Sequence, residues 1–365
     1  MDKKKSIAII SVFAAMIFGL FVWQLILPDA ATSKSERRKL TQLPEISVKA
    51  MLSGGFSKDL EDYLLDQFPQ RDAFRTLKAV ARMSVLRQRD NNGIYLVGDS
   101  IFKLDYPLKD DQVLFAAQKL NSIRADYLDG CNVYYSVIPD KNYFAAAQNG
   151  YPCVDYDLLF KLLGDNVEGM QYIDITDCLS LSDYYRTDTH WRQECILPVA
   201  QRLAQKMGAG MITPKEAYTE HTLAPFSGVY LGQSALPVPT DSITYLTSPA
   251  TDGATVTSIE ADGIQHVYTL DKFSGMDSYD IFLSGAAALQ VIEMKDAGNG
   301  RELILFRDSF ASSIAPLLLG AYSKITLVDL RYFSSKLLGE HVDFDGADVL
   351  FLYSTGLINS AMLLK

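Results

Sequence analysis

The sequence lacks the basic face that a nucleic-acid-binding protein needs. Its formal net charge is −10 and its pI is about 5.0, and no segment concentrates lysine and arginine enough to neutralise phosphates. It also lacks internal repeats and low-complexity tracts, so we expect a folded chain without long disordered regions. With 365 residues and 48% hydrophobic content, it suits one large domain, or one domain with an insertion.

Cysteine is scarce. The four cysteines, Cys131, Cys153, Cys178 and Cys195, include no C-x-x-C spacing, which disfavours zinc-binding and thioredoxin-like sites. An even number permits two disulfides outside the cytoplasm. Neighbourhood in the sequence suggests Cys131–Cys153 and Cys178–Cys195, although four cysteines allow three pairings. The alternative is that they are small buried thiols.

The N-terminal segment has the length and composition of a membrane span. Three lysines at positions 3–5 precede an uncharged run, Ser6–Pro28, that is long enough to cross a bilayer as a helix. A signal peptide usually has a shorter apolar region, so we predict a cytoplasmic tip and an uncleaved anchor at residues 1–28, although the following DAAT leaves cleavage open. Basic residues at 34–39 compete with the three lysines, but we favour a single-pass cell-membrane protein whose remaining chain is extracytoplasmic.

After the anchor, the pattern indicates a stalk and then a folded domain. Residues 29–45 are charged and lack periodicity, so they resemble a stalk, and the folded part is expected at residues 46–365. Apolar residues at helical spacing predict a pair of helices at 56–68 and 74–81. The segment NNGIYLVGDSIFKL then has two short β-rich runs around a Gly-Asp pair, which predicts a hairpin.

From about residue 110, predicted strands and helices alternate, which is the rhythm of a parallel sheet with helices on its faces. The expected elements are a helix at 111–126, a strand at 133–138, a helix near 155–163, a strand at 172–175 and a helix at 192–207. Short alternating runs rich in Thr, Ser, Gly and Pro then predict a β-rich insertion at about 209–290. The rhythm resumes with a strand at 302–306, a helix at 309–322 and strands at 324–330 and 348–353. The fold class is therefore α/β with a mainly parallel sheet.

The segment LILFRDSFASSIAPLL, residues 303–318, takes an apolar strand into a helix at Arg307-Asp308-Ser309. Such a turn can display a serine at the carboxyl edge of a parallel sheet, where α/β proteins build their sites. Unpaired N–H groups at a helix N-terminus suit the oxyanion that forms when a serine attacks an ester. The alternative is that Ser309 or Asp308 simply caps the helix.

A second polar segment, YYRTDTHW at residues 184–191, places Asp188 and His190 two positions apart. A serine nucleophile needs an adjacent base, usually an imidazole whose far nitrogen is held by a carboxylate. In an extended loop, residues i and i+2 point to the same side, so Asp188 can orient His190. Because both follow a predicted strand, we expect them at the same sheet edge as Ser309. A lone D-x-H pattern is common, but of the other three histidines only His341 has a comparable carboxylate partner nearby.

The stretch GDSI, residues 98–101, imitates the nucleophile block of GDSL-type esterases. We reject Ser100 as the nucleophile because Gly-Asp between two β-like runs is ordinary turn chemistry. No helix is expected to begin at Ser100, so we expect no free N–H groups of a helix N-terminus there to hold an oxyanion.

Several segments resemble, in order, the DHHW family, relatives of the alginate O-acetylation proteins with an SGNH-hydrolase-like fold. They are RRKLTQLPE, DYLLDQFPQRD, NNGIYL, IPDK, DYYRTDTHW, YDIFL, LFRDSFASSIAPLL and VDLRYF, and they span nearly the whole chain after the anchor. The resemblance implies a three-layer sandwich and a triad of Asp188, His190 and Ser309. Thr189 stands where the family motif has a second histidine, which bears on substrate preference rather than on the triad. The family's Gly and Asn oxyanion donors are not assigned in this sequence.

Further residues are candidate substrate ligands. Arg331 and Tyr332 follow a strand at the expected active edge, and Lys141 follows another. Each could bind a sugar hydroxyl, although Arg331 could instead pair with a carboxylate and Lys141 could be a solvated loop residue. Trp191 is either a platform on which a sugar stacks or a wedge under the catalytic loop, and we favour the wedge.

The leading hypothesis is a membrane-tethered, extracytoplasmic serine acyltransferase or esterase that acts on O-acetyl groups of a cell-surface or secreted polysaccharide through an acyl-Ser309 intermediate. We expect no cofactor and no nucleic acid. The expected partners are the carbohydrate polymer, the membrane and a multi-spanning acyltransferase that supplies acetyl groups. The alternatives are a polysaccharide-binding or assembly protein with a vestigial triad, and metal-assisted deacetylation with Asp188 and His190 as ligands, which needs a further ligand.

Overall fold

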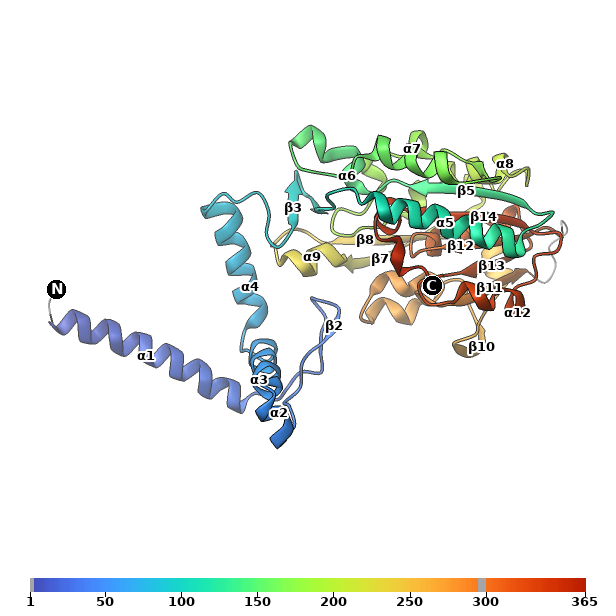
Figure 1. Ribbon diagram of the computed structural model, residues 1–365. Helices are drawn as coiled ribbons and strands as arrows, with labels where there is room; N and C mark the ends of the chain where they lie inside the picture. The colour runs from blue at the N-terminus through green and yellow to red at the C-terminus, as the bar shows by residue number, and fades with distance from the viewer. Residues whose placement is uncertain (1–2, 295–299) are drawn as a thin grey trace. The chain divides into compact units, whose positions relative to one another are not determined.

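The computed structural model describes residues 3–294 and 300–365, so Met1 and Asp2 of the predicted anchor segment lie outside the described residues. The chain divides into two compact units (Figure 1). The first comprises Met1–Asn92 with Leu231–Pro237, and the second comprises Gly93–Tyr230 with Val238–Lys365.

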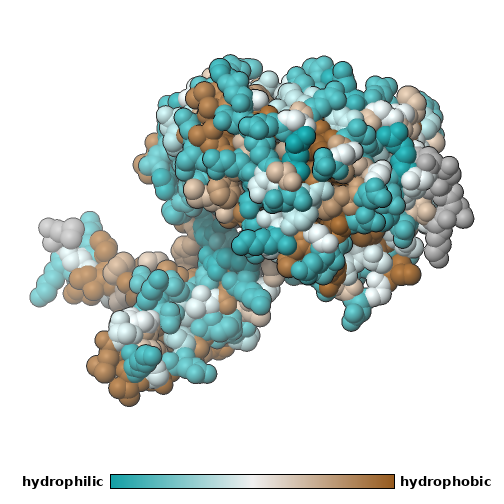
Figure 2. All heavy atoms as spheres, turned by 45° about the vertical axis from the view of Figure 1, so that its right-hand side comes forward, coloured by the Kyte–Doolittle hydropathy of each residue, from teal (hydrophilic) through white to brown (hydrophobic). Residues whose placement is uncertain are grey.

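The first unit begins with α1 (Lys3–Ile26), a helix of 24 residues that is long and apolar enough to cross a membrane. Figure 2 shows hydrophobic side chains along this helix, beside the hydrophilic side chains of its N-terminal end. Helices of this length and composition near an N-terminus occur both as membrane anchors and as signal sequences.

The rest of the first unit is helical. It contains α2 (Val48–Leu52), α3 (Gly55–Asp66) and α4 (Arg71–Val80), which continues as a π-helix over Ala81–Val85. The predicted helical pair is therefore present as α3 and α4. The expected stalk is not a bare linker, because it contains β1 (Thr32–Ser33) and β2 (Arg38–Lys39) and because Arg38 pairs with Asp66 at the end of α3. Mainly through this hydrogen-bonded ion pair, Arg38 lowers the pKa of the Asp66 carboxyl.

The second unit is built on a mainly parallel sheet. The strands are β5 (Asn132–Ile138), β6 (Gln171–Tyr172), β9 (Ala254–Ser258), β10 (Ala261–Gln265), β11 (Leu289–Met294), β12 (Glu302–Arg307), β13 (Lys324–Val328) and β14 (Asp348–Ser354). Within the described residues their order is β10-β9-β11-β13-β12-β14-β5-β6. The strands from β13 to β6 pair in parallel, and β9, β10 and β11 pair antiparallel. The predicted mainly parallel sheet is confirmed.

Helices cover both faces of this sheet. The helices of the second unit are α5 (Asp110–Tyr127), α6 (Lys141–Ala145), α7 (Tyr156–Asn166), α8 (Leu197–Lys206), α10 (Pro249–Gly253), α11 (Ala311–Ile314), α12 (Leu338–His341) and α13 (Thr355–Ile358). A further helix, α9 (Val229–Ser234), begins in the second unit and ends in the first. Along β12, Leu303 and Leu305 enter a core shared with α8 and α11, whereas Ile304 and Phe306 enter a core shared with α5 and α7. Figure 1 shows α5 running beside β5 and β14. The three predicted layers follow from this alternation.

The segment predicted as a β-rich insertion is only partly separate from the main sheet. In it, β7 (Thr219–Phe226) and β8 (Asp241–Thr247) form their own two-stranded sheet, whereas β9 and β10 extend the main sheet through β11. Short alternating runs predict strands without revealing which sheet each strand joins. The predicted hairpin is present as β3 (Ile94–Val97) and β4 (Ser100–Lys103).

The predicted disulfides are wrong, because all four cysteines, each among the described residues, are free thiols with partly exposed side chains. The physical reason is clearest for Cys131 and Cys153, which precede and follow β5. The Cys131 thiol donates to the Phe344 carbonyl near the start of β5 and β14, whereas the Cys153 thiol lies near Asp140, just after the end of β5. A strand of seven residues separates its two ends by roughly 20 Å, far more than the Cα separation of about 7 Å that a disulfide tolerates.

The carboxyl ends of the parallel strands form one edge of the sheet. β5, β14, β12 and β13 lie side by side in that order and run in the same direction. The loops that follow them begin at Pro139, Thr355, Asp308 and Asp329, so these loops open on the same edge. This is where the sequence predicts the functional residues.

Candidate active site

Ser309 lies in the tight turn between β12 and α11, partly exposed at the edge of the sheet. Asp308 stabilises this turn, since its Oδ1 accepts the Phe310 N–H at 3.0 Å and its Oδ2 accepts the Ser354 N–H at 2.8 Å. The Ser309 hydroxyl is therefore not the group that caps the turn. A single helix is expected at 309–322. The structure has the short α11 there, followed by a 3-10 helix over Ala315–Gly320. The change of helix type falls at Pro316, a residue without an N–H for an α-helical hydrogen bond.

The segment 184–191 folds back on itself. Tyr184 and Trp191 face each other in an antiparallel bridge, and the Tyr185 N–H donates to the His190 carbonyl at 3.1 Å. Asp188 lies at the tip of this loop and its side chain is fully buried. The sequence predicts that Asp188 and His190 point to the same side of an extended loop. In the structure their side chains meet because the 184–191 segment closes on itself.

The structure brings Asp188, His190 and Ser309 together in one hydrogen-bonded chain. Asp188 Oδ1 lies 2.7 Å from His190 Nδ1, and His190 Nε2 lies 2.8 Å from Ser309 Oγ. Asp188 Oδ1 also accepts the His190 N–H at 3.1 Å, and Oδ2 accepts the Val229 N–H at 2.7 Å. A carboxylate held by several donors stays fixed, so it can hold the imidazole with Nε2 facing the serine.

Tyr279 supports the imidazole from the side. Its ring stacks on His190 with centroids 3.9 Å apart and planes 6° apart, and its hydroxyl donates to Ser313 Oγ at 2.9 Å. Phe310 packs against the same imidazole at 4.9 Å. Tyr279 belongs to the YDIFL segment, for which the sequence offered a family likeness but no role.

Trp191 is a wedge and not a sugar platform. Its side chain is completely buried, so neither face of the indole can stack on a ligand. The indole Nε1 donates to the Phe310 carbonyl at 3.1 Å and to Ser313 Oγ at 2.9 Å. The residue after His190 therefore binds the turn that carries Ser309, which holds the two segments in register.

The predicted insertion supports the loop that carries Asp188. Asp241 Oδ2 accepts the Thr187 N–H at 2.7 Å and the Thr187 hydroxyl at 2.6 Å, and the Gly228 N–H donates to Thr187 Oγ1 at 3.0 Å. The Gly228 backbone approaches so closely that a Cβ there would clash with the Thr187 carbonyl. Sequence reasoning missed Asp241 and Gly228, because nothing local in the sequence marks a contact across so many residues.

Lys141 is a buried hub on α6 rather than a solvated loop residue. Its side chain is 3% exposed, and Nζ donates to the carbonyls of Ile101, Tyr185 and Arg186 at 2.7, 2.8 and 2.9 Å. A fourth carbonyl, that of Asp188, lies at 3.3 Å. An ammonium has three N–H donors, so these contacts use all of them and leave none for a substrate. Burial lowers the pKa of Lys141 to about 7.

The other candidate ligands lie at the same edge in different surroundings. Arg331 donates to both carboxylate oxygens of the buried Asp329, at 2.9 and 2.6 Å, which is the pairing that the sequence left open. The exposed fraction of Tyr332 is 52%, and the Arg331 guanidinium lies over its ring at 5.3 Å. A ligand role for these two residues stays a prediction.

The GDSI stretch has the geometry of a turn. Gly98 and Asp99 connect β3 to β4, and Ser100 begins β4 instead of a helix. Asp99 pairs with Arg186 at 2.9 Å, so its side chain braces the neighbouring 184–191 loop.

No group of three or more potential metal ligands comes together in the part of the chain that the structure describes. Both ring nitrogens of His190 are already hydrogen-bonded, one to Asp188 and the other to Ser309. The further ligand that metal-assisted deacetylation needs is therefore not found among the described side chains.

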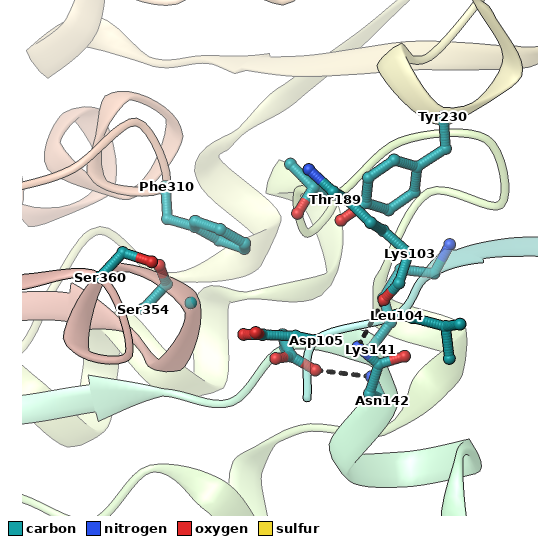
Figure 3. A pocket seen from close by; sticks show the side chains of 12 residues that line it. Lys103, Leu104, Asp105, Lys141, Asn142, Thr189, Tyr230, Phe310, Ser354 and Ser360 are labelled. Carbon is teal, nitrogen blue, oxygen red and sulfur yellow. Dashed lines mark hydrogen bonds between the residues drawn. The ribbon is translucent and has the colours of Figure 1, made fainter. Parts of the chain in front are cut away.

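A cavity of about 240 Å³ adjoins the triad. Its wall includes Thr189, which lies between Asp188 and His190, and Phe310, which follows Ser309. Figure 3 shows Thr189 and Tyr230 on one side of it and Phe310 and Ser354 on another, with Asp105 on its border below them in this view. The site thus combines a serine–imidazole–carboxylate chain with a space for a small ligand.

The comparisons with known proteins identify the fold. No protein-family model matches the chain, and no curated protein matches its sequence. The crystal structure of a DHHW family protein from Eubacterium siraeum is 21% identical over 74% of this chain and 93% of that chain, with a TM-score of 0.61. Two structures of Bacillus cereus PatB1, one with a sulfonyl adduct, are 16% and 17% identical over 73% of this chain and 97% and 95% of those chains, with TM-scores of 0.59 and 0.57. The SGNH-hydrolase-like fold implied by the sequence resemblance is confirmed.

The contact between Gly228 and Thr187 predicts an effect on turnover. In Gly228→Ala, the new Cβ would push the Thr187–Asp188 backbone away and weaken the bond from the Val229 N–H to Asp188. We expect kcat for p-nitrophenyl acetate to fall about 100-fold, the loss that a displacement of about 1 Å can cause. Gly253→Ala is the matched control, because its Cβ would meet open space. Parent-like turnover in Gly228→Ala would contradict this role.

The buried Lys141 predicts a pH-dependent stability difference. An unfolded lysine keeps its proton up to about pH 10.4, whereas in the folded chain burial lowers the pKa of Lys141 to about 7. Unfolding therefore takes up a proton between these values, so its free energy rises with pH, by at most about 1.4 kcal/mol per pH unit. The Lys141→Met variant has no titrating group at this position, so its free energy of unfolding lacks this rise with pH.

We therefore expect the gap in Tm between the parent and Lys141→Met to widen between pH 7 and pH 9, measured by thermal melting of the full chain in detergent. Lys161→Met removes an exposed lysine paired with Asp165 and should show a small gap that is constant with pH. A constant gap for Lys141→Met as well would contradict the lowered pKa.

Proposed function

We propose that this protein is a membrane-tethered, extracytoplasmic serine acyltransferase or esterase that acts on O-acetyl groups of a polysaccharide. The observation that carries the proposal is the continuous chain of hydrogen bonds from Asp188 through His190 to Ser309. A serine is a weak nucleophile at neutral pH unless a base takes its proton as it attacks. Here the base is within hydrogen-bonding distance and its far nitrogen faces a buried carboxylate.

In the first half-reaction, Ser309 Oγ attacks the carbonyl carbon of an acetyl ester while its proton moves to His190 Nε2. The tetrahedral intermediate then collapses, the ester C–O bond breaks, and His190 returns the proton to the departing alcohol oxygen. The product is acetyl-Ser309. The backbone N–H of Ser309 is our candidate donor to the oxyanion; the Phe310 N–H is already bonded to Asp308.

In the second half-reaction, a hydroxyl group attacks acetyl-Ser309. His190 takes the proton of that hydroxyl, a new C–O bond forms, the bond to Ser309 Oγ breaks, and His190 returns a proton to Oγ. A sugar hydroxyl gives transfer and water gives hydrolysis. We favour transfer, because the resemblance is to O-acetylation proteins and because a cavity beside the triad can hold an acceptor.

The surroundings of the triad support this assignment. Asp188 is fully buried and bonded to the Val229 N–H, so it holds one imidazole orientation without reorganising. Stacking on Tyr279 leaves the His190 ring little freedom to turn. Ser309 is partly exposed while the groups behind it are buried, which is the arrangement a nucleophile needs to meet a polymer.

The anchor helix α1 fits a location at the outer face of the cell membrane. There, a multi-spanning membrane protein would carry acetyl groups across the bilayer and deliver them to this site. The polysaccharide would approach from outside. This partnership is inferred from the anchor and from the need for an acetyl donor.

A covalent probe tests the nucleophile. We expect phenylmethanesulfonyl fluoride to react with the full chain in detergent and to modify Ser309, which intact-mass and peptide mass spectrometry would locate. PatB1, which shares the fold, has been crystallised with a sulfonyl adduct. Ser309→Ala should lose the modification, whereas Ser100→Ala, the matched control in the GDSI turn, should keep it. Absence of labelling and turnover in the parent, with glycan binding retained, would support the binding-protein alternative.

Replacing Asp188 by Asn tests the role of the carboxylate. The amide has nearly the same size but does not fix the imidazole in the orientation that the serine needs, so we expect kcat to fall by about 10³–10⁴ with little change in KM. The melting temperature should change little in comparison. Asp262→Asn, an exposed residue in β10, provides the same change of charge away from the site. A parent-like kcat in Asp188→Asn would contradict the assigned role.

A further inference from the structure

We propose that the cavity beside the triad is the acceptor subsite and that it accepts a single neutral or amino-bearing sugar residue while rejecting a uronate. This inference rests on the proposed function, and it names the chemical class of the acceptor. It is carried by the position of the cavity, its volume, and the charges and hydrogen bonds of its wall.

The position of the cavity suits the second half-reaction. Thr189 contributes to its wall from between the two catalytic residues of the 184–191 loop, and Phe310 contributes from the residue after Ser309. Figure 3 shows both side chains bordering the same space. A ring held there has its hydroxyl groups close to the segment that carries acetyl-Ser309, so one of them can attack the acyl carbon and give its proton to His190.

The volume limits the ligand to about one ring. The cavity measures about 240 Å³, which is below the range of about 300–1,000 Å³ for pockets that enclose drug-sized molecules. A polymer would therefore insert one sugar residue and leave its neighbours outside. Such insertion suits modification at a side hydroxyl, since only that hydroxyl has to reach the serine.

The wall is suited to hydroxyl groups. Four residues that carry hydroxyl groups line the cavity: Thr189, Tyr230, Ser354 and Ser360. Hydroxyls both donate and accept, so they can pair with sugar hydroxyls in either sense. Thr189 replaces the second histidine of the family motif, so at this position the cavity meets an uncharged hydroxyl instead of an imidazole.

Two carboxyl groups make the cavity acidic. Asp105 accepts the Asn359 amide at 3.0 Å, and Asp140 accepts the Tyr156 and Thr355 hydroxyls at 2.8 and 3.0 Å. Burial raises the pKa of both carboxyls, and the charge of Asp105 raises that of Asp140 further. In their ionised form, Asp105 and Asp140 would repel the carboxylate of a bound uronate, which is a like-charge contact inside a confined space.

The cations of the described cavity wall do not offset this acidity. Lys141 lines the cavity, but its N–H groups point to backbone carbonyls and leave no donor for a ligand carboxylate. Lys103 is exposed, so water screens its charge. The predicted ligand Arg331 is already paired with Asp329. An amino sugar, in contrast, would bring a positive charge toward Asp105.

Protection from labelling tests the selectivity. The full chain in detergent is treated with phenylmethanesulfonyl fluoride in three parallel reactions. Each reaction contains one oligosaccharide, derived from chitosan, from cellulose or from mannuronate, at equal length and concentration. We expect the first two to slow the modification of Ser309 at concentrations at least about tenfold lower than the mannuronate needs, since unfavourable like-charge contacts weaken binding by at least that factor. Asp105→Asn should reduce this ratio, and Asp262→Asn, an exposed residue in β10, should leave it unchanged.

Equal protection by the mannuronate would overturn the proposal, as would an unchanged ratio in Asp105→Asn. Failure of Ser309 labelling in the parent would contradict the proposed function instead. In that case saturation-transfer NMR with the same three oligosaccharides and the Ser309→Ala chain measures the cavity directly. Binding of the cello- and chitosan oligomers without the mannuronate supports the selectivity, and tighter binding of the mannuronate overturns it.

Discussion

The hydrogen bond between His190 and Ser309 joins two loops that are 119 residues apart in the sequence, and the rest of the site depends on it. Such a bond needs both loops at the same sheet edge, which the parallel direction of β6, β5, β14 and β12 provides, since the 184–191 loop follows β6 and Ser309 follows β12. It also needs the loops to keep a fixed distance. The buried Trp191 ensures this, since its indole donates to the turn that carries the serine.

The sequence predicted the parts of this protein whose signals are local. Alternating strands and helices predicted the mainly parallel sheet with helices on its faces, and the two cores on either side of the sheet are where these helices pack. The sequence also offered Asp188 and His190 as partners of Ser309, because the chain has four histidines and only His190 and His341 lie two positions from an acid. The structure places Asp188, His190 and Ser309 in one hydrogen-bonded chain. The disulfides failed for the opposite reason: proximity in sequence says little about distance once a strand separates two residues.

The sequence could not predict the contacts that depend on tertiary packing. Lys141 read as a loop residue because its four carbonyl neighbours come from β4 and from the 184–191 loop, and no local pattern records them. Tyr279 and Asp241 lie in the segment expected to be an insertion, yet Tyr279 stacks on the His190 imidazole and Asp241 accepts the N–H of Thr187, the residue before Asp188. A local pattern thus pointed to the residues of the hydrogen-bonded chain but not to the residues that hold them in place.

The support of Asp188 by Gly228 and Val229 constrains how this protein can diversify. The segment that supports Asp188 is an excursion from the alternating core, and such connections commonly tolerate changes of length. The outer parts of β7 and β8 can change, because they do not touch Asp188. The few residues that contact Asp188 or Thr187 have to stay matched to the 184–191 loop. Chimaeras that exchange this excursion between relatives would therefore stay active only when both segments come from the same parent.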